Sequence, residues 1–77
     1  MLRAATRNLS FGGVFIDSPI TFSRDTRLKL RLALPGEVQP LELGGIVRWT
    51  RPGSFGVCFS GLRFRDVCAL ERYLEAL

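Results

Sequence analysis

The sequence predicts an all-β domain that ends in one C-terminal helix. Three observations indicate this class. Apolar and polar residues alternate through the middle of the chain, turn residues recur at short intervals, and the apolar period changes to that of a helix near residue 66. A chain of 77 residues has room for one domain, so we expect residues 1–77 to form a single unit.

The clearest strand signal lies between Thr26 and Leu34. Leucines occupy every second position, and the positions between them hold two arginines, a lysine and an alanine. A period of two is typical of a half-buried strand, here with leucines inward and cations outward. The sequence Leu34-Pro35-Gly36 predicts the turn that ends this strand.

A second strong signal covers residues 41–50. One parity of this segment is apolar throughout, and paired glycines interrupt its middle, which predicts a bulge or bend at Gly44-Gly45. A tight turn at residues 51–54 then predicts a hairpin with the alternating segment that follows it, residues 55–60. Within residues 41–50, the large apolar side chains that share one parity are Leu41, Leu43, Val47 and Trp49.

Weaker signals complete the set of elements. Residues 14–16 form a short β-branched and aromatic run, and residues 2–7 are a further strand candidate, which places all strands within about residues 2–61. Beyond them, apolar side chains recur at helical spacing over about residues 66–76. Asp66 is the expected N-cap of this helix because a carboxylate accepts a backbone N–H of the first turn.

The composition argues against catalysis. The chain has no histidine, so the commonest general base and metal ligand is missing, and its two cysteines are too few for a zinc site of four cysteine or histidine ligands. No nucleophile–base pair or carboxylate pair stands out. We therefore expect no enzyme activity, no metal and no cofactor. Cys58 and Cys68 are expected to pack as small, reduced, buried side chains.

The net charge of +4 lies entirely within residues 1–31, and ten of the eleven cations are arginine. Arginine suits bidentate contact with phosphate, so the charge favours an anionic partner, although a solvated cationic face is the alternative. Single-stranded nucleic acid is disfavoured because the aromatic residues are not regularly interleaved with the cations. The chain has no run of about 18 apolar residues and no apolar signal-type run at its start, so we expect no membrane span and a cytoplasmic location.

One short motif combines polar groups with glycines. Asn8-Leu9-Ser10-Phe11-Gly12-Gly13 stands between two strand candidates in the most cationic part of the chain. On an extended segment, Asn8 and Ser10 would point the same way, and each offers donors and acceptors. The glycines permit positive φ and close approach of a backbone or a flat ligand. A plain polar turn is the alternative interpretation.

Together these segments resemble a known family. Asn8-x-Ser10-x-x-Gly13, followed by residues 14–16, is similar to the [D/N]-x-S-x-x-G signature of PilZ domains. The leucine strand, its Pro-Gly turn and the closing helix also resemble that family, as do the segments Gly45-x-Val47-x-Trp49 and Gly56-Val57-Cys58-Phe59. The resemblance covers nearly the whole chain and implies an antiparallel six-stranded β-barrel with a C-terminal helix.

The resemblance also implies a function. Many PilZ domains are receptors for the bacterial second messenger cyclic di-GMP. By this likeness Asn8 and Ser10 would hydrogen-bond a guanine, and the Gly12-Gly13 turn would allow its close approach. Trp49 would form an apolar wall near a base if its ring lies at the barrel surface; a core tryptophan is the alternative.

The sequence departs from the family pattern in one respect, the position of its arginine pair. PilZ domains carry an R-x-x-x-R clasp one full strand before the glycine motif, whereas Arg3-Ala4-Ala5-Thr6-Arg7 directly abuts Asn8. We therefore expect the first strand and its clasp to be absent and the barrel to be incomplete, with Arg3 and Arg7 as candidate ligand contacts. The alternative function is a degenerate PilZ-like interaction module in motility or pilus regulation, which pairs with a protein partner or self-associates through an exposed sheet edge.

Overall fold

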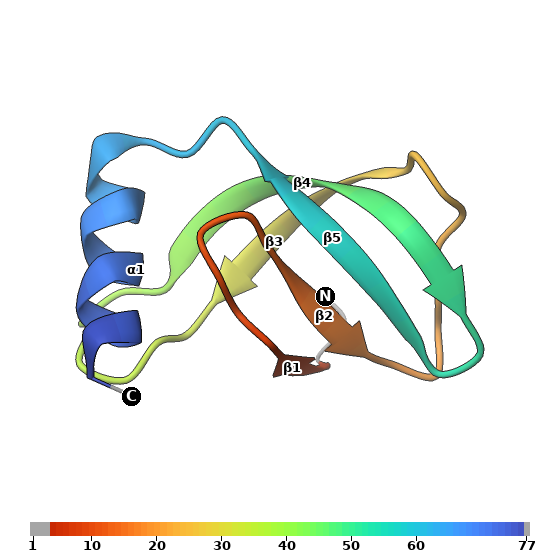
Figure 1. Ribbon diagram of the computed structural model, residues 1–77, viewed down its shortest axis with the longest axis horizontal. Coiled ribbons are helices and arrows are strands. Elements are labelled where there is room, and N and C mark those ends of the chain that lie inside the picture. Colours follow the sequence, from red (N-terminus) through yellow and green to blue (C-terminus); the bar gives the residue numbers. More distant parts are fainter. Residues whose placement is uncertain (1–3, 77) are drawn as a thin grey trace.

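Five strands and one helix make up the computed structural model, which describes residues 4–76. In the sheet the strands lie in the order β1-β2-β5-β4-β3, and each neighbouring pair is antiparallel. The helix lies across one end of the curled sheet (Figure 1). In chain order the elements are β1 (Ala5–Arg7), β2 (Gly13–Asp17), β3 (Arg27–Leu32), β4 (Leu41–Arg51), β5 (Ser54–Ser60) and α1 (Phe64–Glu75).

The six strands that the family resemblance implies are wrong for the described residues, which form five strands in a curled half-barrel, so the expectation of an incomplete barrel is confirmed there. The all-β class with a C-terminal helix is confirmed. The two long connections, residues 18–26 and 33–40, add no strand, although Asp25 and Thr26 at the end of the first exchange backbone hydrogen bonds with Val47 of β4.

The inner face of the sheet holds the core. Near α1, four leucines of β3, β4 and the residues next to them surround Ala69 and Leu70, which are 1% and 0% exposed. Farther from the helix, Val14 and Val57 are among the side chains that β2, β4 and β5 contribute to a second cluster. Leu9, from the motif, packs against both clusters. The predicted inward leucines are thus confirmed, with Leu32 buried and Leu28 half-buried.

The helix begins at Phe64, earlier than expected, and Asp66 is not its N-cap. Arg63 is the N-cap residue, and Asp66 lies in the first turn, where its Oδ2 accepts the Arg63 backbone N–H at 3.0 Å. The same oxygen lies 3.2 Å from Arg63 Nε. Asp66 therefore stabilises the helix start from inside the first turn, which is the acidic half of a capping box.

The bulge predicted at Gly44-Gly45 is also misplaced. Both glycines lie in regular register with β3, opposite Lys29 and Leu28. Gly45 faces inward, where a Cβ atom would overlap Val57, so a close approach of side chains explains the glycine there. The irregularity in β4 comes later, between Val47 and Trp49.

The curled sheet does not close on itself among the described residues. Its edges are β1 and β3, and a hollow of about 290 Å³ lies between them on the inner side. We call this gap the open seam. Thr6 lines it from β1, Leu28 and Leu30 line it from β3, and Ile16 and Phe55 form part of its floor.

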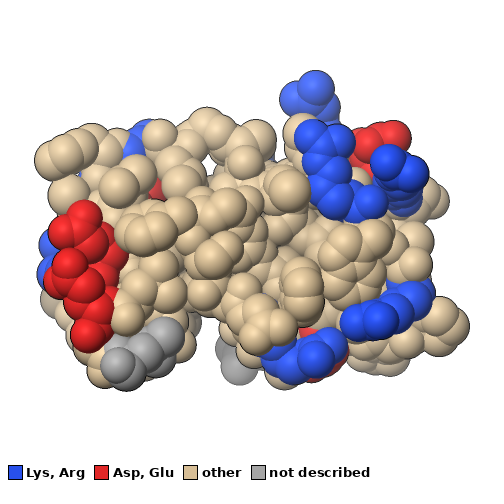
Figure 2. All heavy atoms as spheres, viewed as in Figure 1, with Lys and Arg blue, Asp and Glu red and all other residues tan. Residues whose placement is uncertain are grey.

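Charge is distributed unevenly along the molecule. Figure 2 shows acidic side chains gathered on the left, over α1, and most of the visible Lys and Arg side chains at the opposite end. Cys58 is exposed on β5, so its expected burial is wrong, while Cys68 on α1 is half-buried. Within residues 4–76, no helix has the length and apolar character needed to cross a membrane.

Candidate functional site

A bulge in β4 decides which way Trp49 faces. Val47 lies opposite Val57 of β5, but Trp49 lies opposite the adjacent residue, Gly56, so Arg48 is the extra residue. One extra residue reverses the side-chain alternation beyond it. Val47 is fully buried on the inner face, whereas Trp49 lies on the outer face and is half-buried. The expectation that Trp49 shares a face with Leu41 and Val47 is therefore wrong, and its ring lies at the surface.

Gly56 provides the space for the tryptophan ring. A Cβ atom at this position would overlap the indole of Trp49, which rests directly on the bare backbone of β5. Phe15, on β2, lies opposite Gly56 from the other side. The Phe15 and Trp49 rings meet edge to face, with centroids 5.0 Å apart and planes at 80°. Such pairs are a favoured aromatic geometry.

The aromatic pair belongs to a row that crosses four strands. Arg7 of β1 lies opposite Phe15 of β2, Phe15 lies opposite Gly56 of β5, and Gly56 lies opposite Trp49 of β4. With strands about 4.8 Å apart, the row spans about 14 Å on the outer face. We call it the aromatic row.

An arginine lies at each end of the aromatic row. Arg7, its β1 member, has its Nε 2.7 Å from a carboxylate oxygen of Asp17, which lies two residues along β2 from Phe15. Arg51 lies over the ring of Trp49, with its guanidinium carbon 4.7 Å from the ring centroid, and its Nε donates to Ser54 Oγ at 3.2 Å. Both side chains project on the same face as Trp49, so this face combines two aromatic rings with two cations.

The motif loop continues from the end of the aromatic row, because Asn8 directly follows Arg7. Asn8 has φ +53°, so the segment is a turn, which was the alternative interpretation, and not an extended stretch. Asparagine tolerates this left-handed conformation better than most residues. Its side chain is exposed, at the same sheet edge as Arg7.

Ser10 holds the turn together. Its Oγ accepts the backbone N–H of Gly12 at 3.2 Å and that of Gly13 at 3.3 Å, and its own N–H donates to the Gly13 carbonyl at 2.9 Å. The Gly12 carbonyl accepts the N–H of Phe59, which fixes the loop to β5. The Ser10 hydroxyl also donates to the Gly13 carbonyl at 3.4 Å, so the structure gives this exposed residue a structural role within the turn.

The two motif glycines serve different needs. Gly13 lies against β5, where a Cβ atom would overlap the Val57 carbonyl, so the expected close approach is that of a backbone. At Gly12 the nearest atom to a Cβ would be Ser10 Oγ at 3.9 Å, so the position has room for a side chain. Neither is among the glycines with positive φ, so that expectation is wrong; within the motif, Asn8 adopts the left-handed conformation.

Of the predicted site residues, the structure brings Arg7, Asn8 and Trp49 to one face and its edge. Arg3 lies outside the described residues. Sequence reasoning missed Phe15 and Arg51, which complete the face. Arg51 was detectable in principle, because it follows Trp49 by two positions and so shares its side of the strand.

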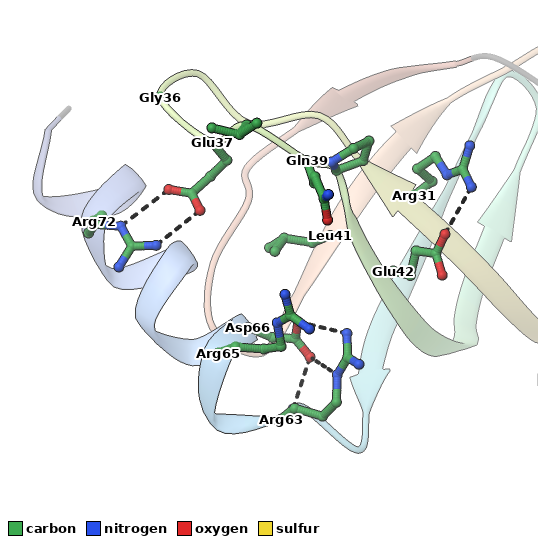
Figure 3. A pocket seen from close by; sticks show the side chains of 12 residues that line it. Arg31, Gly36, Glu37, Gln39, Leu41, Glu42, Arg63, Arg65, Asp66 and Arg72 are labelled. Carbon is green, nitrogen blue, oxygen red and sulfur yellow. Dashed lines mark hydrogen bonds and ion pairs between the residues drawn. The ribbon is translucent and has the colours of Figure 1, made fainter.

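A second cluster of charges surrounds a hollow of about 800 Å³ between α1 and the loop after β3 (Figure 3). Its charged groups form ion pairs across elements: Arg72 lies 2.9 Å from Glu37, and Arg31 lies 2.8 Å from Glu42. The hydrogen bond and charge of Arg31 lower the pKa of Glu42, and those of Glu37 raise the pKa of Arg72. The first pair joins the helix to the loop and the second joins β3 to β4. Together with Arg63 and Asp66, six of the seven charged residues that line the hollow are paired with one another, so the hollow is mainly a structural network.

Asp66 lines the same hollow. Burial works to raise the pKa of its carboxyl, but the hydrogen bonds from the Arg63 side chain and backbone, with the charges of Arg63 and Arg65, outweigh burial and lower it. Asp66 is therefore an ionised helix anchor and not a proton donor.

Comparison with known families agrees with the arrangement of strands, motif and helix. The model of the PilZ domain matches residues 1–76. Neither the curated proteins nor the solved structures give a match. Because the family match covers essentially the whole length, this chain belongs to the PilZ domains, a family of cyclic di-GMP receptor domains.

Proposed function

We propose that this chain is a non-enzymatic receptor domain that binds cyclic di-GMP on the outer face of β1, β2, β5 and β4. The observation that carries the proposal is the aromatic row, which joins Arg7 to Trp49 on one face and ends beside the family motif. A flat, doubly anionic dinucleotide needs apolar surface for its bases and cations for its phosphates. The row and its flanking arginines supply both.

Each site residue has a stated role in this proposal. The exposed amide of Asn8 and the hydroxyl of Ser10 hydrogen-bond a guanine edge, since both groups donate and accept. Gly12, which has open space around it, lets the base approach the loop, and Gly13 keeps the loop close to β5. Trp49 supplies apolar surface, and Arg7, with Arg3 before it, contributes positive charge.

Calorimetric titration with cyclic di-GMP tests the proposal, with GTP as the control for guanine binding alone. We expect heat of binding with the cyclic dinucleotide and much weaker heat with GTP. Nuclear magnetic resonance spectra of the backbone amides locate the binding site: the signals of residues 8–13 and of β5 should shift when cyclic di-GMP is added. Binding that moves only signals of α1 and the loop after β3 would contradict the proposed face.

The open seam favours a second candidate function, a PilZ-like interaction module. Leu28 and Leu30 are only half-buried there, and both edge strands present unpaired backbone groups within the described residues. An extended segment of a protein partner or of a second copy would pair with an edge and cover these leucines. Light scattering over a concentration series tests self-association, and Leu30→Lys should abolish any dimer formed through the seam. A monomer at every concentration that also binds cyclic di-GMP would favour the receptor.

A further inference from the structure

The two arginines beside the aromatic row differ in how their charge is compensated. Arg7 is paired with Asp17 at 2.7 Å, and the two side chains are 49% and 39% exposed. Arg51 has no carboxylate within 4.0 Å among residues 4–76, and its hydrogen bond in that part of the chain is to a neutral hydroxyl. The positive charge next to the aromatic pair is therefore that of Arg51.

Arg51 is also held in position. Its Nε is bonded to Ser54 Oγ, and Ser54 is a buried residue at the start of β5, 6% exposed. Its guanidinium lies over the Trp49 ring, which in turn rests on Gly56. Stacking and tethering restrict the side chain while both terminal nitrogens keep their N–H groups, so a ligand meets a donor that has already lost much of its freedom.

We propose that Arg51 is the principal cationic contact for a phosphodiester group bound on the outer face, ahead of Arg7. This inference rests on the proposed receptor function and assigns one part of it. Arg51 donates its terminal N–H groups to phosphate oxygens, the bidentate geometry for which a guanidinium is suited. Arg7 contributes less, because a phosphate there competes with Asp17 for the same guanidinium.

Calorimetry on variants of the full chain tests the ranking. One charge-assisted contact corresponds to a loss of roughly tenfold to a hundredfold in affinity, so Arg51→Ala should weaken cyclic di-GMP binding at least tenfold. Arg7→Ala should weaken it by a smaller factor. Arg65→Ala is the matched control, since Arg65 lines the hollow at α1 and should leave the affinity unchanged.

A conservative variant separates charge from geometry. Arg51→Lys keeps the positive charge but loses the planar fork, so its affinity should fall between those of the parent and Arg51→Ala. Thermal unfolding of each variant shows whether a loss of affinity comes from a loss of stability of the fold. The fluorescence of Trp49, the one tryptophan of the chain, gives a second signal. Ligand binding should change its emission in the parent protein, and in Arg51→Ala the same change should need a higher ligand concentration.

The outcomes are distinguishable. If the parent protein binds and Arg51→Ala binds equally well, or if Arg7→Ala causes the larger loss, the assignment of Arg51 is wrong and the receptor function stands. If the parent protein shows no heat and no change in Trp49 emission with cyclic di-GMP, the receptor function and this inference fail together.

Discussion

Two substitutions at Asn8 separate its backbone role from its side-chain role. The residue has φ +53°, a region that costs a residue with a Cβ atom roughly 1–2 kcal/mol and that asparagine and glycine tolerate. Asn8→Gly keeps this conformation and removes the amide. Glycine adopts this backbone conformation without strain, but its greater flexibility in the unfolded chain lowers the free energy of unfolding by about 0.5–1 kcal/mol, which offsets that gain. Asn8→Ala removes the same amide and adds strain.

The expected values follow from these terms. Asn8→Gly should unfold within a few degrees of the parent protein, whereas Asn8→Ala should lose about 1 kcal/mol, which corresponds to roughly 4–8 °C in a domain of this size. If the amide contacts guanine, both variants lose one or two neutral hydrogen bonds of about 0.5–1.5 kcal/mol each. For a single bond this is about a two- to twelvefold loss of affinity.

Thermal unfolding followed by circular dichroism, together with calorimetric titration of cyclic di-GMP, measures both effects. Parent-like affinity in Asn8→Gly would refute the ligand contact and leave Asn8 as a turn residue. An Asn8→Ala variant as stable as the parent would refute the argument from the left-handed backbone.

Three further changes test the loop, the helix anchor and the core. Ser10→Ala removes three long hydrogen bonds of an exposed turn, so we expect a loss of stability below about 1 kcal/mol by urea unfolding, and a larger loss would mark Ser10 as essential to the fold. Asp66→Asn should lower stability at neutral pH by about 1 kcal/mol, because the capping contact weakens. The pKa of Asp66 is lowered in the folded state, so its stabilisation is present above the ordinary value of 3.8 and is lost as the pH falls toward the lowered pKa; Asp66→Asn should lack this acid-dependent loss. Leu70→Ala, at a fully buried position, should cost about 2–5 kcal/mol, and a change below 1 kcal/mol would contradict the packing of α1 on the sheet.

The parts of the fold that follow regular alternation were predictable. The leucine strand, the long strand after the Pro-Gly turn and its hairpin partner were each expected within a few residues of their observed bounds. Their apolar faces are buried, and burial is what imposes a period of two on a sequence. The terminal helix followed in the same way from its apolar stripe.

The helix start shows why boundaries are harder. Asp66 was expected to be the N-cap, but a carboxylate satisfies the helix start equally well from the first turn, where it accepts the N-cap N–H. The prediction correctly connected Asp66 with the start of the helix, but it placed Asp66 at the N-cap instead of in the first turn. Phe64, 85% exposed, adds nothing to the apolar stripe and so gave no signal.

The candidate site was predictable only where the motif lies. The motif located the loop, but alternation cannot show that Asn8 turns left-handed, that Ser10 bonds within the loop, or that Gly13 faces the Val57 carbonyl. The first two are local turn features, which strand alternation does not describe, whereas the approach of Gly13 to Val57 depends on β2 and β5 lying side by side, about 40 residues apart in the chain. Phe15 was missed because its contact with Trp49 forms only when β2 and β4 come together on either side of β5 in the sheet.

The bulge at Arg48 decides which side chains of β4 reach the outer face. Without the extra residue, Trp49 and Arg51 would continue the parity of Leu43 and Val47 and point to the inner side of the sheet. Burial of the guanidinium does not by itself enforce the bulge, because Thr50, which lies opposite the inward Phe55 at this end of β4, is exposed. The indole supplies a clearer reason, since the bare backbone of Gly56 and the ring of Phe15, which it contacts, both lie on the outer face. The bulge moves both side chains to that face, where the cation lies over the indole, and so creates the surface that we propose binds the dinucleotide.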